Sequence, residues 1–124
     1  MSKSVLVVDD EANISLSLQF LMTQAGYDVR TAADGEAAIQ AVRDALPDLI
    51  LLDVNMPKRS GFEVCETIRA NPAWGPHVRI VILTAKGREI EKEKGLALGA
   101  DDYITKPFST QEVVAKVNKM LGKE

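Results

Sequence analysis

Four apolar stretches of the chain each end in polar residues that could take part in chemistry. A carboxylate at the mouth of an apolar strand is costly to desolvate unless something there uses or neutralises it. The residues that follow these stretches are three carboxylates, a hydroxyl and an ammonium: Asp9 and Asp10, Asp53, Thr84, and Lys106. Strand ends share one edge in a parallel sheet, so neighbouring strands would bring these side chains together.

The chemistry that suits this set is phosphoryl transfer. Two carboxylates about 4 Å apart repel by roughly 4 kcal/mol at an effective dielectric of 20, so three of them favour a bound cation. Oxygen donors without His or Cys suit Mg²⁺ rather than zinc. Asp53 is the candidate nucleophile because its stretch is the most apolar and should be central. A carboxylate can form an acyl phosphate, while the metal and Lys106 offset charge on the phosphoryl oxygens.

The remaining polar residues would complete such a site. Asp9 and Asp10 would hold the metal, and the backbone carbonyl of Asn55 could complete its shell. Thr84 could hydrogen-bond a phosphoryl oxygen once one arrives, and the loop after it would then follow. Simpler roles exist for each residue: an Asp or a Thr can cap a helix, and Lys106 can be a surface lysine. These roles do not explain why all of them fall at the same edge.

The elements that must position these residues are short apolar strands. The stretches lack polar alternation, which is typical of a parallel sheet covered on both faces. The strands expected are Val5–Val8, a weaker Asp28–Ala32, Leu49–Leu52, Ile80–Leu83 and Tyr103–Thr105.

Helical patterns lie between the strands. Residues 36–45 repeat small apolar side chains, Ser60 with Glu63 and Ser109 with Glu112 form possible capping boxes, and residues 88–98 are a charged helix. The thin apolar face expected of this charged helix consists of Ile90, Ala97 and Leu98. The first helix is ambiguous, because residues 14–20 alternate like a strand. A helical stripe also fits, and its length and the closing Gly26 favour a helix.

Seven of the nine residues Lys86–Lys94 are charged, with mixed signs. Their spacing allows the pairs Glu89–Lys92 and Glu91–Lys94, each worth a few tenths of a kcal/mol. Two interpretations stay open for this segment: a solvated helix face, or a marginal helix that shifts when Thr84 moves.

Alternation of strand and helix predicts an α/β fold, an open parallel sheet of five strands with helices on both faces. The 124 residues suit one domain, and the net charge of −3 argues against a nucleic-acid surface. The single Cys65 excludes an internal disulfide. No apolar run approaches the roughly 18 residues of a membrane span, and the first residues do not form a signal peptide. We expect a soluble cytoplasmic protein with no direct contact to nucleic acid or membrane.

Four motifs, in order at the strand ends, resemble one family: Val7–Glu11, Asp53–Pro57 with Gly61, Leu83–Ala85, and Gly99–Phe108. The chain, 1–124, resembles a single receiver domain of two-component response regulators. The resemblance implies a flavodoxin-like, doubly wound sheet with strand order 2-1-3-4-5. It implies that Asp53 accepts a phosphoryl group from a sensor histidine kinase or a histidine phosphotransfer protein.

The resemblance also implies roles for the other residues of the site. Mg²⁺ would be bound by the Asp10 and Asp53 side chains and the Asn55 carbonyl, with Asp9 alongside. Thr84 and Lys106 would bind the phosphoryl group, and the rotamer of Tyr103 would follow Thr84. The further residues expected at the site are Ala85, Lys86 and Pro107, the last after a cis peptide bond.

The expected function is a phosphorylation-activated signalling switch that catalyses its own phosphorylation and dephosphorylation rather than an enzyme acting on other molecules. Output would come from a downstream protein bound at Arg88–Leu98, Tyr103 and the last helix, or from a missing C-terminal output domain. One alternative is a small phosphatase of the haloacid dehalogenase type, although Asn55 stands where those enzymes normally have a second Asp. The others are a docking-only pseudo-receiver and a flavin-binding module, whose phosphate-cradling loop the sequence lacks.

Overall fold

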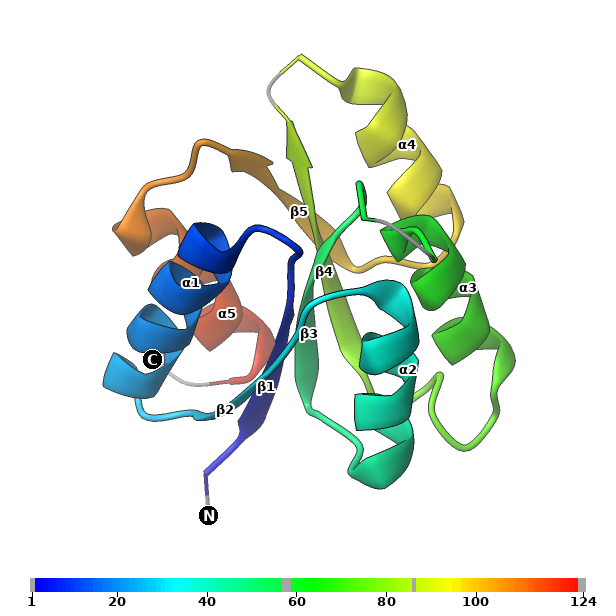
Figure 1. Cartoon of the computed structure of the whole chain (residues 1–124), viewed down its shortest axis with the longest axis horizontal. Helices are drawn as coiled ribbons and strands as arrows, with labels where there is room; N and C mark the ends of the chain where they lie inside the picture. The colour runs from blue at the N-terminus through cyan, green and yellow to red at the C-terminus, as the bar shows by residue number, and fades with distance from the viewer. Residues whose placement is uncertain (1, 57–58, 86, 123–124) are drawn as a thin grey trace.

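The computed structural model describes residues 2–56, 59–85 and 87–122. Five parallel strands alternate with five helices (Figure 1). The strands are β1 (Ser4–Val8), β2 (Asp28–Ala32), β3 (Leu49–Asp53), β4 (Arg79–Ala85) and β5 (Asp102–Lys106). The helices are α1 (Ala12–Gln24), α2 (Gly35–Asp44), α3 (Gly61–Ala70), α4 (Glu89–Ala97) and α5 (Thr110–Met120). Within the described ranges, no helix is long and apolar enough to cross a membrane.

The sheet has the order β2-β1-β3-β4-β5, so the predicted fold is confirmed and β3 is the central strand. In the parallel register Val8 pairs with Leu52, and Asp53 pairs with Leu83. Thr84 pairs with Thr105 within the sheet. Asp53, Thr84 and Lys106 are therefore themselves strand residues, where the sequence had placed them just beyond the strands.

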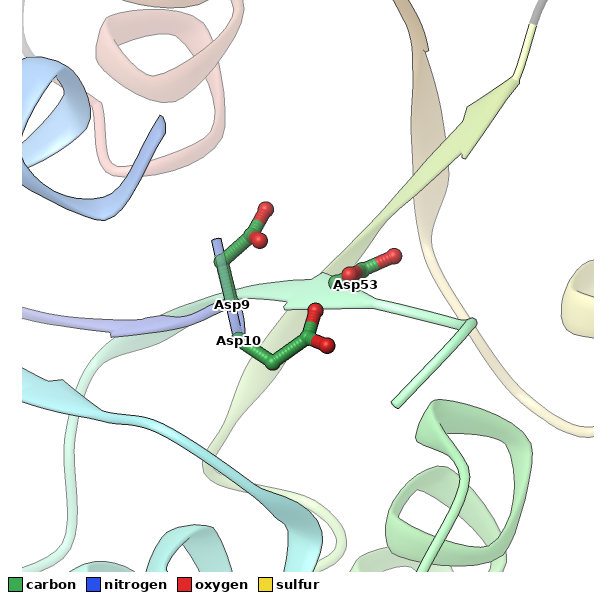
Figure 2. Close-up of side chains that lie close together, drawn as sticks. All are labelled: Asp9, Asp10 and Asp53. Carbon is green, nitrogen blue, oxygen red and sulfur yellow. The ribbon is translucent and has the colours of Figure 1, made fainter. Parts of the chain in front are cut away.

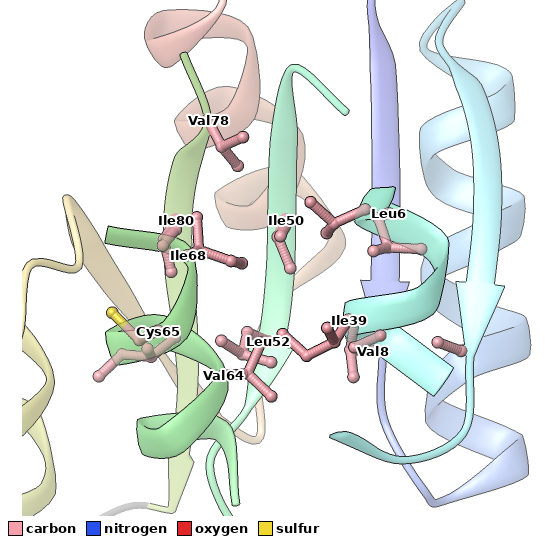
Figure 3. Packing of buried hydrophobic residues seen from close by; sticks show 14 of the residues in the cluster. Leu6, Val8, Ile39, Ile50, Leu52, Val64, Cys65, Ile68, Val78 and Ile80 are labelled. Atoms are coloured by element: carbon pink, nitrogen blue, oxygen red, sulfur yellow. The ribbon is translucent and has the colours of Figure 1, made fainter. Parts of the chain in front are cut away.

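Two apolar clusters cover the two faces of the sheet. Helices α2 and α3 pack over one face, where Ile39, Val64 and Ile68 meet Ile50 and other strand residues (Figure 3). Helices α1 and α5 lie on the other side of the sheet (Figure 1) and share the second cluster with the alternate strand residues. Because both faces are covered, the strands need no polar alternation. The polar residues at the carboxyl edge are held by a rigid sheet.

Helix starts differ in how they are fixed. Side-chain oxygens of Asp34, Ser60 and Ser109 accept hydrogen bonds from the backbone of α2, α3 and α5. At α3 the complete capping box of Ser60 and Glu63 predicted from the sequence is present. The N-cap residues of α1 and α4, Glu11 and Arg88, make no side-chain cap hydrogen bond.

Some predicted core positions were wrong. Ile90 is 79% exposed and Ala97 is also exposed, so of the apolar face expected of α4 only Leu98, its C-cap residue, packs against the core. Ile90 and Ala97 are seven positions apart and so share one face of the helix. The residues that α4 buries lie on a different face and are Glu91 and Gly95. On α1, by contrast, Leu18 and Met22 are buried while Leu16 and Phe20 are exposed, which is the helical solution of the ambiguous pattern.

Candidate functional site

Three carboxylates lie together at the carboxyl edge of β1 and β3. Each of Asp9, Asp10 and Asp53 offers an oxygen atom, and these oxygens all lie within 4.8 Å of one another (Figure 2). Asp9 and Asp53 are 2% and 4% exposed, and Asp10 is exposed. The pairing of β1 with β3 causes this proximity, because it places the ends of the two strands side by side.

Backbone hydrogen bonds orient the two buried carboxylates. The backbone N–H of Glu11 donates to Asp9 Oδ1 at 2.9 Å, and the backbone N–H of Asn55 donates to Asp53 Oδ1 at 3.1 Å. Each bond is made by the residue two positions further on, so the loop after each strand fixes the carboxylate that ends it. Asp53 can therefore point one oxygen at Asn55 and leave the other for the site.

Burial raises the pKa of Asp53 from its ordinary value of 3.8 to about 6. The Asn55 hydrogen bond and the charge of Lys106 lower this pKa, and the neighbouring charges of Asp9 and Asp10 raise it. The carboxyl thus holds its proton to unusually high pH because it is buried beside two other carboxylates. A cation among the three oxygens would favour the charged form.

Lys106 provides one such positive charge. Its Nζ lies 2.9 Å from Asp9 Oδ2, 3.4 Å from Glu11 Oε1 and 3.7 Å from Asp53 Oδ2. Burial lowers the pKa of Lys106, but its hydrogen bond to Asp9 and the three carboxylates raise it by more, so the net shift is upward. The ammonium stays charged at neutral pH, with the cis Lys106–Pro107 bond directly after it.

Thr84 lies at the neighbouring strand end. It is 1% exposed, and its Oγ1 is one of two buried side-chain oxygens with no hydrogen-bond partner among the residues described. A buried hydroxyl left unpaired costs about 1–3 kcal/mol, so the position favours an incoming hydrogen-bonding group. Ala85 follows at the exposed end of β4, paired with Lys106. Lys86 and Pro57, also named from the sequence, lie outside the described residues.

Tyr103 lies on β5, half-buried against the α3 side of the sheet. Its ring has the Nζ atoms of Lys92 and Lys116 at 4.7 Å and 5.2 Å from its centroid. These cations come from α4 and α5, so the ring contacts both helices that flank β5. The proposed coupling of its rotamer to Thr84 stays a prediction.

Gly61 begins α3 directly beneath the site. A Cβ built there would lie 2.2 Å from the carbonyl oxygen of Asp53 and 2.7 Å from the Cα of Val54. A side chain at this position would therefore clash with the backbone. The glycine lets α3 approach the backbone that carries Asp53.

Two acidic residues near the site were given no role there by the sequence, although Glu11 belongs to the Val7–Glu11 motif. Glu11 contacts Lys106, and Glu91 of α4 is only 6% exposed, although it lies in a charged segment. Glu91 Oε2 accepts a hydrogen bond from Asn55 Nδ2 at 3.4 Å. Its position in the first turn of α4 carried no signal, because charges surround it in the sequence.

The donor set fits a hard divalent cation. It consists of carboxylate oxygens, two of them buried, close enough to share one ion, with a backbone carbonyl at Asn55 available nearby in the chain. No sulfur or imidazole belongs to the group. Burial, and then the charges of Asp9 and Asp10, raise the pKa of Asp53, so a cation bound here would favour the ionised carboxylate.

Comparison with known proteins agrees with this geometry. Residues 5–118 match the family model of the response regulator receiver domain. The chain is 50% identical over 121 residues to the alkaline phosphatase synthesis transcriptional regulatory protein PhoP of Bacillus subtilis (strain 168). This match covers 98% of the chain and 49% of PhoP, so the chain spans about half the length of that relative.

Solved structures of similar proteins cover the whole fold. A Chloroflexus aurantiacus J-10-fl chain described as a response regulator matches with a TM-score of 0.94 and 36% identity, covering 99% of this chain and 100% of that one. The chemotaxis response regulator CheY4 of Vibrio cholerae matches with a TM-score of 0.89 and 32% identity, covering 97% and 99%. The match to the family model, the identity to PhoP and the shared fold agree on one conclusion. This chain belongs to the response regulator receiver domain family, whose members are phosphorylation-activated signalling switches.

Proposed function

We propose that Asp53 is the phosphoryl acceptor of this receiver domain and that the donor is a phosphohistidine on a sensor kinase or a phosphotransfer protein. The observation that carries this assignment is the position of Asp53: it is buried at the end of the central strand, between an acidic pair and Lys106 Nζ at 3.7 Å. In the transfer, an Asp53 oxygen bonds to phosphorus as the phosphorus–nitrogen bond breaks. The histidine nitrogen leaves with the electron pair of that bond.

Mg²⁺ is the metal we assign to the acidic cluster. The side chains of Asp10 and Asp53 and the carbonyl of Asn55 would hold it, with Asp9 alongside. When bound, it would supply positive charge against the phosphoryl oxygens and the attacking carboxylate. Asp10 is the exposed member of the cluster and so leaves room for waters, which Mg²⁺ usually keeps.

Lys106 and Thr84 would bind the transferred group. Lys106 Nζ already lies among the carboxylates, so a phosphoryl oxygen on Asp53 would find an ammonium within reach. Thr84 Oγ1 is buried and unpartnered among the described residues, and it would donate to another phosphoryl oxygen. Tyr103 would respond to the movement of Thr84, with Ala85, Lys86 and Pro107 at the border of the site. These contacts stabilise the charge that develops during transfer.

Docking of the donor needs an apolar surface beside the acceptor. Leu16 and Phe20 of α1 are 67% and 62% exposed, and Leu16 lines a depression of about 300 Å³ together with Asp9 and Asp10. We assign this face of α1 to the kinase or phosphotransfer partner, because exposed apolar side chains next to a site mark interaction surfaces.

The chain acts as one receiver domain, residues 1–124, that catalyses its own phosphorylation and dephosphorylation. Output is passed to a downstream protein or to a C-terminal output domain, through α4, Tyr103 and α5. The docking-only alternative is not favoured, because Asp53, Lys106 and the acidic pair are all retained. The phosphatase alternative is not favoured by the family match, and Asn55 stands where its second acid would be.

The test is the intact mass of the protein after incubation with acetyl phosphate, with Mg²⁺ and then with a chelator. We expect a gain of one phosphoryl group only with Mg²⁺, and no gain in the Asp53→Asn variant, whose melting temperature shows that it is folded. A folded Asp53→Asn variant that is still phosphorylated at the wild-type rate would place the acceptor elsewhere. No gain in the wild type under either condition would contradict the proposed reaction.

A further inference from the structure

Helix α4 packs on the sheet in an unusual way. The residues that it buries are Glu91 and Gly95, and its N-cap residue Arg88 makes no side-chain cap. A Cβ at Gly95 would lie 2.2 Å from Ile82 Cδ1, so the helix backbone rests closely on β4. A helix with so little apolar burial depends on polar contacts for its position.

Glu91 makes the polar contacts in question. Its Oε2 lies 3.4 Å from Asn55 Nδ2 and 3.1 Å from a guanidinium nitrogen of Arg88. Its Oε1 is buried and has no partner among the described residues. The sequence had suggested a pair between Glu91 and Lys94, but the Lys94 ammonium lies 4.5 Å over the ring of Phe62 instead. A buried carboxylate that is only partly satisfied is sensitive to every change in its surroundings.

Asn55 connects this carboxylate to the acceptor. Its backbone N–H donates to Asp53 Oδ1, and its side-chain amide donates to Glu91 Oε2. One residue therefore touches both the site and the first turn of α4. This connection is separate from Thr84, which reaches α4 along the chain through the end of β4.

We propose that Glu91 is a positioning residue that, through Asn55, holds α4 in its unphosphorylated position and releases it when Asp53 is phosphorylated. This inference rests on the proposed function for its trigger, whereas the contact itself is a property of the unmodified protein. A phosphoryl group adds a charge of about −1.5 to −2 beside the loop that carries Asn55. That charge opposes the buried Glu91 carboxylate, so the Asn55–Glu91 contact weakens and the first turn of α4 is freed.

Coupling of this kind acts in both directions. A partner that displaces α4 removes the Glu91 carboxylate from the loop of the acceptor. It would therefore favour the phosphorylated form and prolong its lifetime. The output surface and the acceptor would then communicate through one hydrogen bond as well as through Thr84.

The first test is a double-mutant cycle on the unmodified protein, with hydrogen exchange of the α4 amides as the readout. Glu91→Ala and Asn55→Ala should each speed this exchange by about fivefold or more. If the two residues act through one contact, the double variant should exchange little faster than either single variant. Glu93→Ala, which removes an exposed carboxylate from the same helix, is the matched control and should leave exchange unchanged.

Additive effects in this cycle, or α4 exchange equal to that of the Glu93→Ala control, would overturn the inference. Because the cycle needs no phosphoryl group, it tests whether the Asn55–Glu91 contact holds α4 even if the proposed acceptor is wrong. Glu91→Gln keeps the shape of the side chain and can still accept from Asn55, so it should fold even if Glu91→Ala does not, and it isolates the effect of the charge in the second test.

The second test compares the wild type with Glu91→Gln after treatment with acetyl phosphate and Mg²⁺. Phosphorylation should speed α4 exchange in the wild type and do so several-fold less in Glu91→Gln, since the neutral amide is not repelled. Equal acceleration in both proteins would overturn the release step while leaving Asp53 as the acceptor. Failure of both proteins to gain a phosphoryl group would instead contradict the proposed function.

Discussion

Helices α3 and α4 both follow strands that end at the site, yet they are held in opposite ways. Helix α3 begins with a complete capping box and buries Val64, Cys65 and Ile68. Helix α4 has no side-chain cap and buries a carboxylate and a glycine. The first arrangement fixes the backbone beneath Asp53, and the second leaves a helix whose position depends on a few polar contacts.

This difference indicates that the α3 side and the α4 side of the site have different roles. Catalytic groups must be held rigidly to be effective, so the acceptor belongs on the fixed side. A helix that reports the state of the site must have two accessible positions, so it belongs on the weakly held side. Thr84 and Glu91, whose buried oxygens lack partners among the described residues, both lie on this second side.

The two glycines under these helices give the largest expected contrast. Gly61→Ala should destabilise the protein by about 3 kcal/mol, because its Cβ would meet the backbone of Asp53 and Val54, which cannot move aside. Gly95→Ala should cost less than about 1 kcal/mol, because its Cβ meets the end of the Ile82 side chain, which can rotate, and because Ala favours a helix. Urea unfolding of both variants measures the difference. Equal losses would contradict the assignment of a rigid and an adaptable side.

Ionisation of Asp53, on the rigidly held side of the site, lowers the stability of the folded protein. Its pKa of about 6 in the folded protein exceeds the ordinary 3.8, so the folded state binds the proton more tightly than the unfolded chain. Stability from this group is therefore present below pH 3.8 and is lost as the pH rises through about 6.

At pH 7 this loss approaches about 3 kcal/mol, and replacing the charged acceptor of the Asn55 N–H with a neutral amide oxygen returns roughly 1 kcal/mol. We therefore expect Asp53→Asn to be about 2 kcal/mol more stable than the wild type at pH 7 without metal, with the advantage shrinking toward pH 4. Thermal unfolding across this pH range measures it. A variant advantage that does not depend on pH would contradict the raised pKa.

Helix caps give a smaller contrast. Ser60→Ala should destabilise the protein by about 1 kcal/mol, because it removes the capping box of α3. Arg88→Ala should change the free energy of unfolding by only a few tenths of a kcal/mol, because Arg88 supplies no cap, its side chain is largely exposed, and the Asn55 contact to Glu91 remains. Chemical unfolding of the two variants side by side tests this, and a larger loss for Arg88→Ala would contradict it.

The smallest effect is expected at Ile90. Because this side chain is 79% exposed, Ile90→Ser should change the free energy of unfolding by less than about 0.5 kcal/mol. Because Ile90 is an exposed part of the proposed output surface, the substitution should instead weaken binding of a downstream partner. A loss of several kcal/mol in an unfolding experiment would restore Ile90 to the core predicted from the sequence.

The sequence was sufficient where one physical pattern dominated. Uninterrupted apolar strands predicted the buried parallel sheet, and the polar residues ending them predicted which side chains meet at its edge. The capping box at Ser60 marked the start of α3 directly. The central position of β3 could be inferred because its sequence is the most apolar of the strands.

Helix α4 was the part that the sequence described poorly. Its charges surround every position, so no periodicity separates buried Glu91 from exposed Glu93. Gly95 has no side chain, so nothing in its residue type predicted that the helix backbone lies close to Ile82. The contact between Asn55 and Glu91 joins residues 36 positions apart, and local patterns carry no information about such a pair.

The most direct test of this account is hydrogen exchange, resolved by segment, on the wild type with Mg²⁺ before and after treatment with acetyl phosphate. The account predicts faster exchange in α4 and altered exchange at the end of β4 around Thr84, with α3 unchanged. Equal changes in α3 and α4, or no change in either despite a phosphoryl group on Asp53, would contradict it.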